Sequence, residues 1–402
     1  MRPFDGRRVL LGVAGGIAAY KTAELARRLV QAGSEVQVIL TSSGARLVGG
    51  TTFEALTGRP VRDSLWEGAL SHIELGRWAD AIVVAPATAD LIAKLAGGIA
   101  DDLLTTTLLA APHRALLAPA MNTRMYEHPA TQRNLETLRS FGHPIVGPAY
   151  GELAEGEVGF GRMAEPEELL AHVGRLLEPV SRWRGCRVVV TAGPTWEPVD
   201  AVRFLGNRSS GRMGHAIAAA AWRRGADVVL INGPTEVSPP SEIEDVRLVE
   251  TAEEMGLALR DALPGADAWF MAAAVADFRP SSPRADKIRR SGGLTSIAVE
   301  PAPDLMVTAG EVASSDCVKV AFALEVGVGE GAEDSARGKL KEKGAHLIVL
   351  NDPSEPGSGF GVETNRVTII DASGATETLP QMLKTEAANE ILDRAERYLP
   401  GG

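Results

Sequence analysis

Cysteine and aromatic residues are both scarce in this chain of 402 residues. The two cysteines, Cys186 and Cys317, are too few for a disulfide scaffold, and neither stands in a metal-binding sequence pattern. Aromatic residues make up 5% of the chain, so its cores must be built mainly from Ala, Val, Leu and Ile. The low cysteine content is typical of a reducing compartment, and we expect a cytoplasmic protein.

Long apolar runs and excess positive charge are missing as well. No stretch approaches the roughly 20 apolar residues of a membrane span. The short apolar stretch after the basic N-terminus leads into an amphipathic helix pattern and not into a cleavage site. The formal net charge of -11 argues against general binding to nucleic acid or to an anionic membrane. We therefore expect an enzyme that acts on small molecules.

Two segments, residues 7–41 and 186–234, begin in the same way. Each reads as an apolar strand, a Gly-rich turn, an Ala-rich helix and a second apolar strand. Continuous apolar strands around a helix indicate a parallel sheet covered on both faces. The sequence therefore predicts two tandem doubly wound, mainly parallel α/β domains, residues 1–180 and 181–402, with the junction at residues 178–185.

Further apolar runs predict the remaining strands of both sheets. They stand at residues 81–85, 115–118 and 143–146 in the first half, and at 268–272, 318–322, 346–350 and 367–370 in the second. Two long connections, residues 233–243 and 279–295, are long enough to be functional or disordered. In doubly wound sheets ligands bind outside the carboxyl ends of the strands, where we look for polar residues.

The first Gly-rich turn, GVAGGIAAYK, places Gly12, Gly15 and Gly16 between a strand and a helix. Glycines there allow backbone N–H groups to approach a phosphate at the helix N-terminus. The turn lacks the full spacing of a dinucleotide fingerprint, so a tight βα turn without a ligand is an equally good interpretation. Ser42 and its neighbours end the second strand and add hydroxyl groups at the same edge.

Polar residues also stand at three other strand boundaries. His72 comes shortly before a strand, Thr88 and Asp90 follow that strand at a helix start, and Met121 and Asn122 follow the next strand. Each has a purely structural explanation: Asp90 as a helix cap, His72 as a surface imidazole and Asn122 as a turn residue. Their expected convergence at one sheet edge favours a binding site.

The motifs AIVVAPATAD (residues 81–90) and PAMNTRMY (residues 119–126), with His72 upstream, resemble flavin-dependent cysteine decarboxylases over about residues 6–180. That family includes phosphopantothenoylcysteine decarboxylase and the lantibiotic peptidyl-cysteine decarboxylases. The resemblance implies a flavodoxin-like domain in which FMN oxidises the substrate thiol, so that the neighbouring carboxylate leaves as CO2. It implies that His72 acts as a base or orients the substrate, and that Asn122 holds the carboxylate. The residues implied to cradle FMN are Gly15, Gly16, Ser42, Ala87, Thr88 and Met121.

One position departs from the family pattern. The segment GELAEGEVGFGRM (residues 151–163) resembles the substrate clamp, but Glu155 stands where the family has a cysteine that supplies a proton during reduction of the enethiol. A carboxyl group desolvated under the clamp has a raised pKa and could donate that proton. Alternatively, Glu155 only binds polar groups and the flavin half is impaired or non-catalytic, while the second half remains active.

The second Gly-rich segment, TAGPTWEPVDAVRFLGNRSSGRMG, is longer and more polar than a simple helix cap requires. Asn207, Ser209, Ser210 and Gly211 stand just before an Ala-rich helix and would present donors to an anion. An N-cap with flexible glycines would explain a single serine. It does not explain so long a polar segment.

Charged residues follow later strands of the second half. Asp277 comes after a strand, and Lys287 stands in the basic loop beyond it. Lysine is a mobile point charge suited to phosphates. Lys339 and Lys343 stand four residues apart on one predicted helix face, where a solvated basic helix end is the plainer interpretation.

These segments, together with MAAAVADF and KLKEKGAHLIVLND, resemble phosphopantothenate–cysteine ligase over about residues 186–396. The order of the two halves is similar to that of the bacterial bifunctional proteins of coenzyme A biosynthesis. The resemblance implies a Rossmann-like domain that uses CTP and Mg2+ or Mn2+ to activate 4′-phosphopantothenate as an acyl-cytidylate, which the amine of cysteine then attacks. It implies that Asn207 stabilises this intermediate, Lys287 serves the attack, and Asp277 contacts nucleotide or metal. The remaining residues implied for the CTP pocket are Ala273, Ala274, Pro303, Asp304, Phe322, Lys339 and Lys343.

The same family forms its flavin sites between subunits. The resemblance therefore implies a homo-oligomer with trimers of flavin domains and dimers of ligase domains, which a dodecamer would satisfy. An NAD-dependent oxidoreductase is a weaker interpretation, because the dinucleotide fingerprint with its ribose-binding acid is missing.

Overall fold

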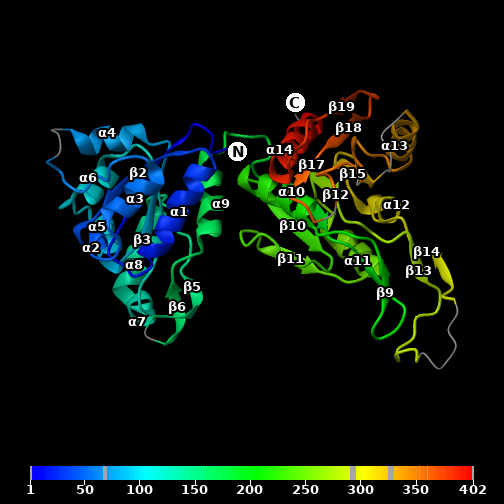
Figure 1. Cartoon of the computed structure of the whole chain (residues 1–402), viewed down its shortest axis with the longest axis horizontal. Helices are drawn as coiled ribbons and strands as arrows, with labels where there is room; N and C mark the ends of the chain where they lie inside the picture. The colour runs from blue at the N-terminus through cyan, green and yellow to red at the C-terminus, as the bar shows by residue number, and fades with distance from the viewer. Residues whose placement is uncertain are drawn as a thin grey trace. The chain divides into compact units, whose positions relative to one another are not determined.

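The computed structural model describes residues 2–66, 70–154, 156–289, 296–324, 330–352, 354–359 and 361–400. The chain divides into two compact units, Met1–Glu178 and Pro179–Gly402, called unit 1 and unit 2 below. Unit 1 runs from blue to teal and unit 2 from green to red (Figure 1). Glu155 lies outside the described residues.

Unit 1 is built on a parallel sheet with the strand order β2-β1-β3-β4. Almost every residue of these strands is buried, as expected when helices cover both faces of a parallel sheet. The strands are β1 (Arg8–Val13), β2 (Glu35–Leu40), β3 (Ala81–Ala87) and β4 (Ala115–Pro119).

Helices cover both faces of this sheet. Alternate residues of β1 point to opposite sides: Val9 packs in one hydrophobic cluster and Leu10 in the other. The first cluster includes α1 (Ala19–Gln31), α3 (Gly50–Thr57) and α9 (Pro166–Leu177). The second includes α5 (Ala89–Gly97), α6 (Leu103–Ala110) and α8 (Pro129–Ser140). The predicted doubly wound arrangement is confirmed for this unit.

Shorter elements complete unit 1. They are α2 (Ser42–Ala45), α4 (Ser71–Trp78), α7 (Thr123–Glu127) and the antiparallel hairpin of β5 (Ala149–Glu152) and β6 (Val158–Arg162). Figure 1 shows α4 and this hairpin at opposite ends of the unit.

One predicted strand of unit 1 is wrong. Residues 143–146 form a single bridge, between Ile145 and Leu117, and no strand. The chain turns away directly afterwards at Gly147, whose φ of 82° is outside the β region. The sheet therefore ends at β4.

Unit 2 contains an eight-stranded sheet with the order β11-β10-β7-β12-β15-β16-β18-β19. Strands β11 to β16 are parallel, and β18 and β19 extend the sheet in antiparallel fashion. The strands are β7 (Arg187–Ala192), β10 (Asp227–Asn232), β11 (Asp245–Leu248), β12 (Ala268–Met271), β15 (Val318–Leu324), β16 (Leu347–Asn351), β18 (Val367–Asp371) and β19 (Thr376–Thr378).

The helices of unit 2 also divide between two faces. One cluster of buried residues joins the sheet to α10 (Arg212–Arg223) and α14 (Lys384–Ala395). The other joins it to α11 (Ala252–Ala262), α12 (Leu305–Thr308) and α13 (Glu330–Glu342). Two short 3-10 turns, η2 (Gly310–Val312) and η3 (Glu396–Tyr398), complete the helical elements. This unit, too, is doubly wound as predicted.

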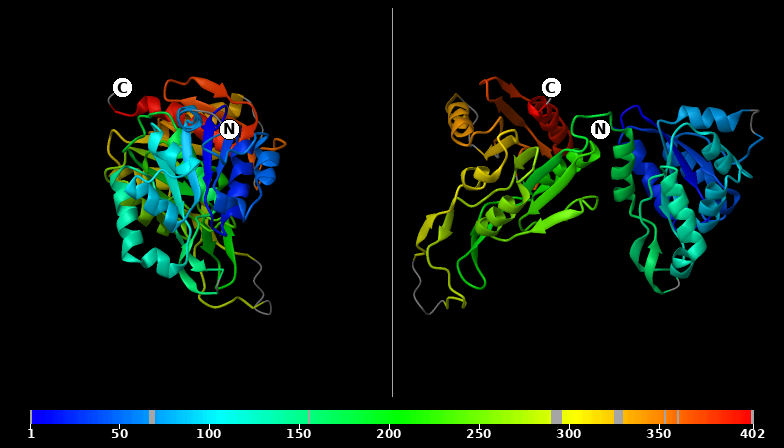
Figure 2. Two further views of the ribbon diagram at one scale, coloured as in Figure 1. Left: turned by 90° about the vertical axis from the view of Figure 1, so that its left-hand side faces the viewer. Right: turned by 180° about the vertical axis from the view of Figure 1, so that it is seen from behind.

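Three small antiparallel pairs lie outside the large sheet. Two of them lie side by side and extend away from it (Figures 1 and 2): β8 (Trp196–Pro198) with β9 (Phe204–Gly206), and β13 (Phe278–Pro280) with β14 (Val299–Pro301). The third joins β17 (Thr364–Asn365) to β20 (Met382–Leu383).

The first and last segments of unit 2 are bonded to each other. The backbone N–H of Arg182 and the hydroxyl of Ser181 donate to the Glu396 carboxylate at 2.7 and 2.8 Å. The Arg182 guanidinium also donates to the backbone carbonyls of Glu396 and Leu399.

No helix in the described parts of the chain combines the length and apolar character needed to cross a membrane.

Candidate functional site

Unit 1 has a cavity of about 880 Å³ at the carboxyl ends of its strands. Its walls are the segments that follow β1, β2, β3 and β4, together with the β5–β6 hairpin. This is the edge at which doubly wound sheets bind ligands, because the strand-to-helix loops and the helix N-termini meet there.

The glycines after β1 are required by close packing at the cavity wall. A Cβ atom on Gly15 would lie 2.4 Å from Cβ of Ser43, and one on Gly16 would lie 3.2 Å from Cγ of Pro86. Any larger side chain at position 15 would push the turn away from the loop after β2. The tight βα turn therefore also forms part of the cavity wall. A structural turn and a phosphate-binding turn are compatible interpretations of this motif.

Two threonines fix the loops that follow β2 and β3. The hydroxyl of Thr41 donates to the Val13 carbonyl and accepts from the N–H of Gly44, each at 3.1 Å. Thr88 caps α5 by accepting from the N–H of Leu91 at 3.3 Å. These bonds place Ser42 and Thr88 at the cavity wall.

Three cations of the cavity wall were missed by the sequence analysis: Lys21, Lys94 and Arg162. Lys21 is largely buried and its Nζ lies 2.7 Å from the Glu165 carboxylate. Arg162 donates to the same carboxylate at 3.1 Å. The position of Lys21, in the first turn after the glycines, was a signal that could have identified it.

Lys94 lies on α5 between two carboxylates. Its Nζ is 3.1 Å from Asp101 and 3.3 Å from Asp90. The hydrogen bond to Asp101 contributes most to raising the pKa of Lys94. This lysine is therefore a permanent cation at the cavity wall near neutral pH.

The β5–β6 hairpin meets the loop after β4. Asn122 caps α7 by accepting from the N–H of Arg124 at 2.8 Å, and its amide donates to Glu157 at a long 3.4 Å. The N–H of Met121 donates to the carbonyl of Gly161 at 3.0 Å. Residues on both sides of this junction line the cavity.

Most of the residues predicted for the flavin half line this cavity: Gly15, Gly16, Ser42, Thr88, Met121 and Asn122. Ala87 does not line the cavity, and its contact with FMN stays a prediction. It is fully buried at the end of β3, where its carbonyl accepts from the N–H of Ala120 at 3.1 Å. Glu155 lies outside the described residues, but Ala154 beside it lines the cavity.

His72 is also not part of the cavity wall. It lies near the start of α4, the helix that precedes β3 in the chain, whereas the cavity lies at the carboxyl ends of the strands. His72 is therefore not among the residues that line the cavity with Asn122, and its role stays a prediction.

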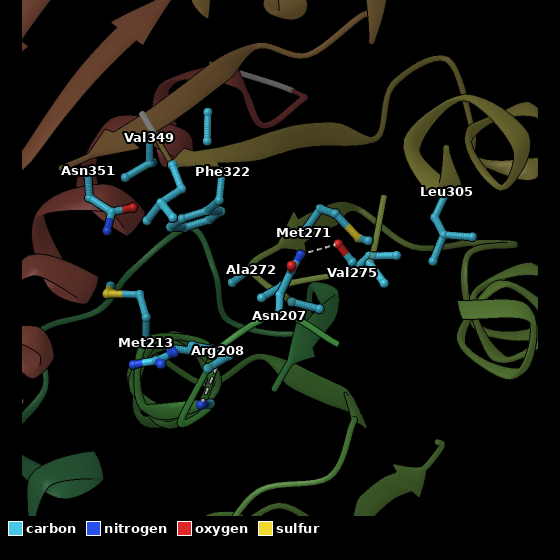
Figure 3. A pocket seen from close by; sticks show the side chains of 18 of the residues that line it. Asn207, Arg208, Met213, Met271, Ala272, Val275, Leu305, Phe322, Val349 and Asn351 are labelled. Carbon is cyan, nitrogen blue, oxygen red and sulfur yellow. Dashed lines mark hydrogen bonds between the residues drawn. The ribbon is translucent and has the colours of Figure 1, made fainter. Parts of the chain in front are cut away.

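Unit 2 has a cavity of about 620 Å³ (Figure 3). It lies beyond the carboxyl ends of β12, β15 and β16 and beside the N-terminus of α10. Figure 3 shows Asn207 beside Val275, with Phe322 and Val349 from two neighbouring strands close to each other.

Side-chain hydrogen bonds hold the loop after β12 in place. The amide of Asn207 donates to the Val275 carbonyl at 2.7 Å and so connects this loop to the segment before α10. Two buried threonines, Thr191 and Thr195, accept from the N–H groups of Ala273 and Ala276 at 3.1 and 3.0 Å. The backbone that lines the cavity is therefore fixed from behind.

The N-terminus of α10 requires a glycine. Gly211 caps the helix with a φ of 75°, and a Cβ atom there would lie 2.6 Å from Cγ2 of Thr235. The N–H of Gly211 donates to the hydroxyl of Ser209 at 3.3 Å. The helix start thus faces the cavity with small residues and backbone donors.

The two predicted lysines of the CTP pocket are one helical turn apart. Lys339 lies in α13, and Lys343 follows the last residue of that helix, with its N–H donating to the Lys339 carbonyl at 2.9 Å. The ammonium of Lys343 lies 3.3 Å from the Asp304 carboxylate, which also caps α12. The plainer interpretation, a solvated basic helix end, does not describe them, because both line the cavity.

All but one of the residues predicted for the ligase half line this cavity: Asn207, Ala273, Ala274, Asp277, Pro303, Asp304, Phe322, Lys339 and Lys343. The exception is Lys287, which is exposed in the segment after β13. Its neighbour Ile288 is anchored to Asp200, whose carboxylate accepts from the Ile288 N–H at 3.0 Å. Lys287 therefore does not line this cavity within one chain, and its role in the attack by cysteine stays a prediction.

A protein-only metal site is not present among the described residues, where no group of three or more His, Cys, Asp or Glu side chains could hold an ion. Asp277 is exposed at the cavity and is the single carboxylate predicted as a metal ligand. Its role toward a metal remains a prediction.

Several cavity residues of unit 2 come from segments that the sequence analysis did not consider. Arg212 begins α10, and Asn365 and Lys384 come from the β17–β20 pair and the start of α14. These two strands have two residues each, too few for a periodic pattern. Only the tertiary structure brings them to the cavity.

Two family models match the chain in tandem. Residues 2–178 match the Flavoprotein model, and residues 183–398 match the model described as DNA/pantothenate metabolism flavoprotein C-terminal domain. Among solved structures, the C-terminal domain of a coenzyme A biosynthesis bifunctional protein CoaBC is 36% identical, with 53% of this chain and 95% of that chain covered and a TM-score of 0.45.

Curated relatives match over nearly the whole chain. The coenzyme A biosynthesis bifunctional protein CoaBC of Vibrio cholerae is 41% identical over 398 residues, which cover 98% of each chain. The protein of the same name from Bacillus subtilis is 42% identical over 394 residues, which cover 96% of each. The chain therefore belongs to the family of coenzyme A biosynthesis bifunctional proteins, with a flavoprotein half followed by a DNA/pantothenate metabolism half.

Proposed function

We propose that the chain catalyses two consecutive reactions of coenzyme A biosynthesis. Residues 181–402 join 4′-phosphopantothenate to cysteine with CTP, and residues 1–180 decarboxylate the product, phosphopantothenoylcysteine, to 4′-phosphopantetheine with FMN. The observation that supports this most strongly is a pair of cavities at the carboxyl ends of two sheets, in a chain that aligns with a bifunctional relative over 98% of both sequences.

The cavity of unit 1 fits a flavin mononucleotide. The turn at Gly15 and the start of α1 offer backbone donors to a phosphate, and Lys21 and Arg162 add positive charge at the wall. Ser42 and Thr88 offer hydroxyl groups from neighbouring loops. When bound, FMN supplies a two-electron acceptor for the substrate thiol.

Asn122 is suited to hold the carboxylate of the substrate. Its Oδ1 is fixed by the N–H of Arg124, which aims the amide nitrogen away from that helix cap. The nitrogen donates to Glu157 at 3.4 Å, a bond long enough to be exchanged for a shorter one to a substrate carboxylate. Binding of the carboxylate by Asn122 fixes the orientation of the carbon–carbon bond that breaks when CO2 leaves.

We retain Glu155 as the donor of the proton that completes the reduction. The neighbouring residues Leu153 and Ala154 line the cavity, and a carboxyl group enclosed there would keep its proton more readily than in water. The rival interpretation, an impaired or non-catalytic flavin half, has no support from the full-length relatives, which are named as bifunctional.

In unit 2, Asn207 and the two lysines have separate tasks. Asn207 is held by its bond to Val275 and presents its remaining amide atoms to the acyl-cytidylate. Lys339 and Lys343 neutralise the triphosphate of CTP, and the ion pair with Asp304 positions Lys343 beforehand. Asp277 is our candidate ligand for Mg2+ or Mn2+ that enters with the nucleotide.

We further infer that His72 and Lys287 act on a neighbouring copy of the chain. Neither residue lines the cavity of its own unit. Trimers of unit 1 and dimers of unit 2, combined as in a dodecamer, would place each of them at the cavity of a neighbouring copy. The cytoplasm is the proposed location, because Cys186 and Cys317 are free thiols.

The test is to supply 4′-phosphopantothenate, cysteine, CTP and Mg2+ to the FMN-loaded protein and to follow the products by mass spectrometry. We expect 4′-phosphopantetheine and CO2. Accumulation of phosphopantothenoylcysteine alone would contradict the proposed decarboxylase activity. Accumulation of the enethiol would contradict the role of Glu155 as the proton donor. The absence of any new product would contradict the proposal as a whole.

A further inference from the structure

Three polar side chains form a hydrogen-bonded network behind the wall of the unit 2 cavity. Nε2 of His215, in the first turn of α10, lies 2.6 Å from Oδ1 of Asn232, the last residue of β10. The amide nitrogen of Asn232 donates to the hydroxyl of Thr235 at 3.2 Å, and that hydroxyl donates to the carbonyl of Val237 at 2.9 Å. None of the three side chains lines the cavity, so this group, called the His215 network below, affects the site only through other residues.

The bond to Asn232 decides which ring nitrogen of His215 carries the proton. The amide nitrogen of Asn232 also donates to the carbonyl of Gly233 at 2.8 Å, which directs Oδ1 toward the ring. An amide oxygen only accepts, so Nε2 of His215 is the donor. Burial is the first cause that lowers the pKa of His215, and the charge of Arg212 is a further cause. The ring is therefore neutral near neutral pH and donates from one fixed nitrogen.

Packing alone does not explain an imidazole at this position. His215 and Asn232 are 6% and 2% exposed, and the neighbouring Ala216 and Ile217 belong to the apolar cluster on this face of the sheet. Nδ1 of His215 is buried and has no hydrogen-bond partner among the described residues, which is unfavourable. An apolar ring would avoid this cost. What histidine adds at position 215 is the bond from Nε2 to Asn232.

The His215 network ends at a methyl group that packs between two turns of the cavity wall. A Cβ atom on Gly193 would lie 2.8 Å from Cγ2 of Thr235, and one on Gly211 would lie 2.6 Å from it. Gly193 follows β7 and Gly211 caps α10, with φ values of 79° and 75°. The two hydrogen bonds of the Thr235 hydroxyl fix the rotamer of this side chain and therefore the place of its methyl group.

The turn at Gly193 holds the loop after β12. Its carbonyl accepts from the N–H of Ala274 at 2.9 Å. The next residue of that loop, Val275, accepts from the amide of Asn207 at 2.7 Å (Figure 3). Ala274, Val275 and Asn207 all line the cavity. A displacement of the Thr235 methyl group therefore reaches Asn207 through two successive hydrogen bonds.

We propose that His215 is a positioning residue of the ligase site. Through Asn232 and Thr235 it fixes the start of α10 relative to the loop after β12, and so holds Asn207 where the acyl-cytidylate forms. The network is closed, because His215 and the Gly211 cap belong to the same helix. The proposal goes beyond the proposed ligase function and rests on it.

The substitution His215→Phe removes the donor and keeps a ring of similar shape. We expect the kcat of ligation to fall about tenfold and the KM values for CTP and 4′-phosphopantothenate to change less than about threefold, because the displaced group acts on the intermediate. His215→Gln places an amide donor near the position of Nε2 and should restore kcat to within about threefold of the parent value. Equal kcat values of the parent protein and His215→Phe would overturn the proposal.

Two changes at position 235 test the far end of the network. Thr235→Ser keeps the hydroxyl and removes Cγ2, whereas Thr235→Val removes the hydroxyl, and both should lower kcat. Because His215 and Thr235 act through the same contact, the double variant His215→Phe/Thr235→Ser should be about as slow as the slower single variant. If the two single effects multiply, the residues act independently and the network is refuted.

His346→Phe is the matched control. Nδ1 of the half-buried His346 accepts from the N–H of Lys319 at 3.1 Å, just before β16, whereas the cavity lies beyond the carboxyl end of that strand. This variant loses a comparable bond from the same sheet, and we expect a lower melting temperature with kcat and both KM values unchanged. A similar loss of kcat in His346→Phe would show a general effect of stability and would overturn the positioning role.

Hydrogen exchange distinguishes failure of this proposal from failure of the ligase function, since it needs no catalysis. In the full chain without ligands, the amides of residues 272–276 should exchange roughly five- to tenfold faster in His215→Phe than in the parent protein, the effect of one lost hydrogen bond on the open population. His346→Phe should leave this segment unchanged. Unchanged exchange in His215→Phe would overturn the positioning role even if ligation proceeds.

Discussion

At the scale of single residues, Gly161 decides how the β5–β6 hairpin meets the cavity of unit 1. A Cβ atom at this position would lie 2.1 Å from the carbonyl oxygen of Met121. The same contact contains the hydrogen bond from the Met121 N–H to the Gly161 carbonyl. The missing side chain therefore allows the hairpin to join the loop after β4.

The variant Gly161→Ala should separate these two segments, because an added methyl group in a packed contact costs about 1–3 kcal/mol. We expect the purified protein to retain less than half of the flavin bound by the parent protein, measured by visible absorbance. Gly97→Ala, in α5, is the control, because its Cβ would meet only Ile99 at an ordinary 3.8 Å. Equal flavin content in both variants would contradict this account of Gly161.

The residues that could be predicted from the sequence share one property: they stand directly after an apolar strand or in a long contiguous motif. Asn207 and Met121 are of this kind, and both line their cavities. Lys384 and Asn365 could not be found, because the segments that carry them are very short and reach the cavity only through tertiary packing. The distance of Lys287 from the cavity could not be predicted, because the sequence does not show where a long loop is anchored.

At the scale of elements, Asp200 connects the two antiparallel pairs that extend from the large sheet of unit 2, β8–β9 and β13–β14. Its buried carboxylate accepts from the N–H groups of Val202, Arg203 and Ile288 at 2.9, 2.9 and 3.0 Å and forms an ion pair with Arg203. The hydrogen bond from Arg203 is the main cause that holds the pKa of Asp200 well below its ordinary value of 3.8. One side chain thus anchors the segment that contains Lys287.

Asp200→Asn should release residues 281–289, because an amide has one acceptor atom where the carboxylate has two. We expect trypsin to cleave after Arg284, Lys287 or Arg289 roughly tenfold faster than in the parent protein, since losing a charged hydrogen bond raises the open population by about that factor. Asp245→Asn, at the exposed start of β11, should leave the cleavage rate unchanged. Identical rates for the two variants would show that Asp200 is not the anchor.

The Asp200 carboxylate also predicts how stability changes as the pH falls. Because the folded pKa of Asp200 is below its unfolded value, its stabilising contribution is fully present above about pH 4 and is lost as the pH falls further. At such acid pH, trypsin is inactive and the fluorescence of Trp196 serves as the measurement. Trp196 stacks on Phe204 with ring centroids 4.2 Å apart, so release of the β8–β9 pair should change its fluorescence.

Long elements were easier to predict than short ones. Strands with five or more apolar residues were found within a few positions, since burial on both faces of a sheet requires continuous apolar sequence. Residues 143–146, His-Pro-Ile-Val, form a shorter and less apolar run, and only Ile145 pairs with a neighbour. Pairs such as β8 and β9 are stabilised by individual contacts, which composition does not report.

At the scale of the whole molecule, four histidines that are buried or half-buried predict how stability depends on pH. Burial is the first cause that lowers the pKa of His143, His172, His215 and His346, and it lowers that of His172 to about 4. The unfolded chain protonates these residues near pH 6.5, while the folded chain takes up the same protons only at a lower pH. Stability is therefore fully present above about pH 6.5 and is lost as the pH falls toward 4.

For His172 alone the loss amounts to at most about 3 kcal/mol between these limits, at about 1.4 kcal/mol per unit of pKa difference. Urea unfolding of unit 1 at pH 7.5 and pH 5 should show this dependence, and His172→Phe should weaken it. His113→Phe, at an exposed position, is the control. An unchanged difference between the two pH values in His172→Phe would contradict the assignment.

The bonds between Ser181–Arg182 and Glu396 bring the two ends of unit 2 together. A chain whose ends meet can be joined there and opened elsewhere, so a circular permutant with new termini in the exposed turn between β18 and β19 should keep the same sheet.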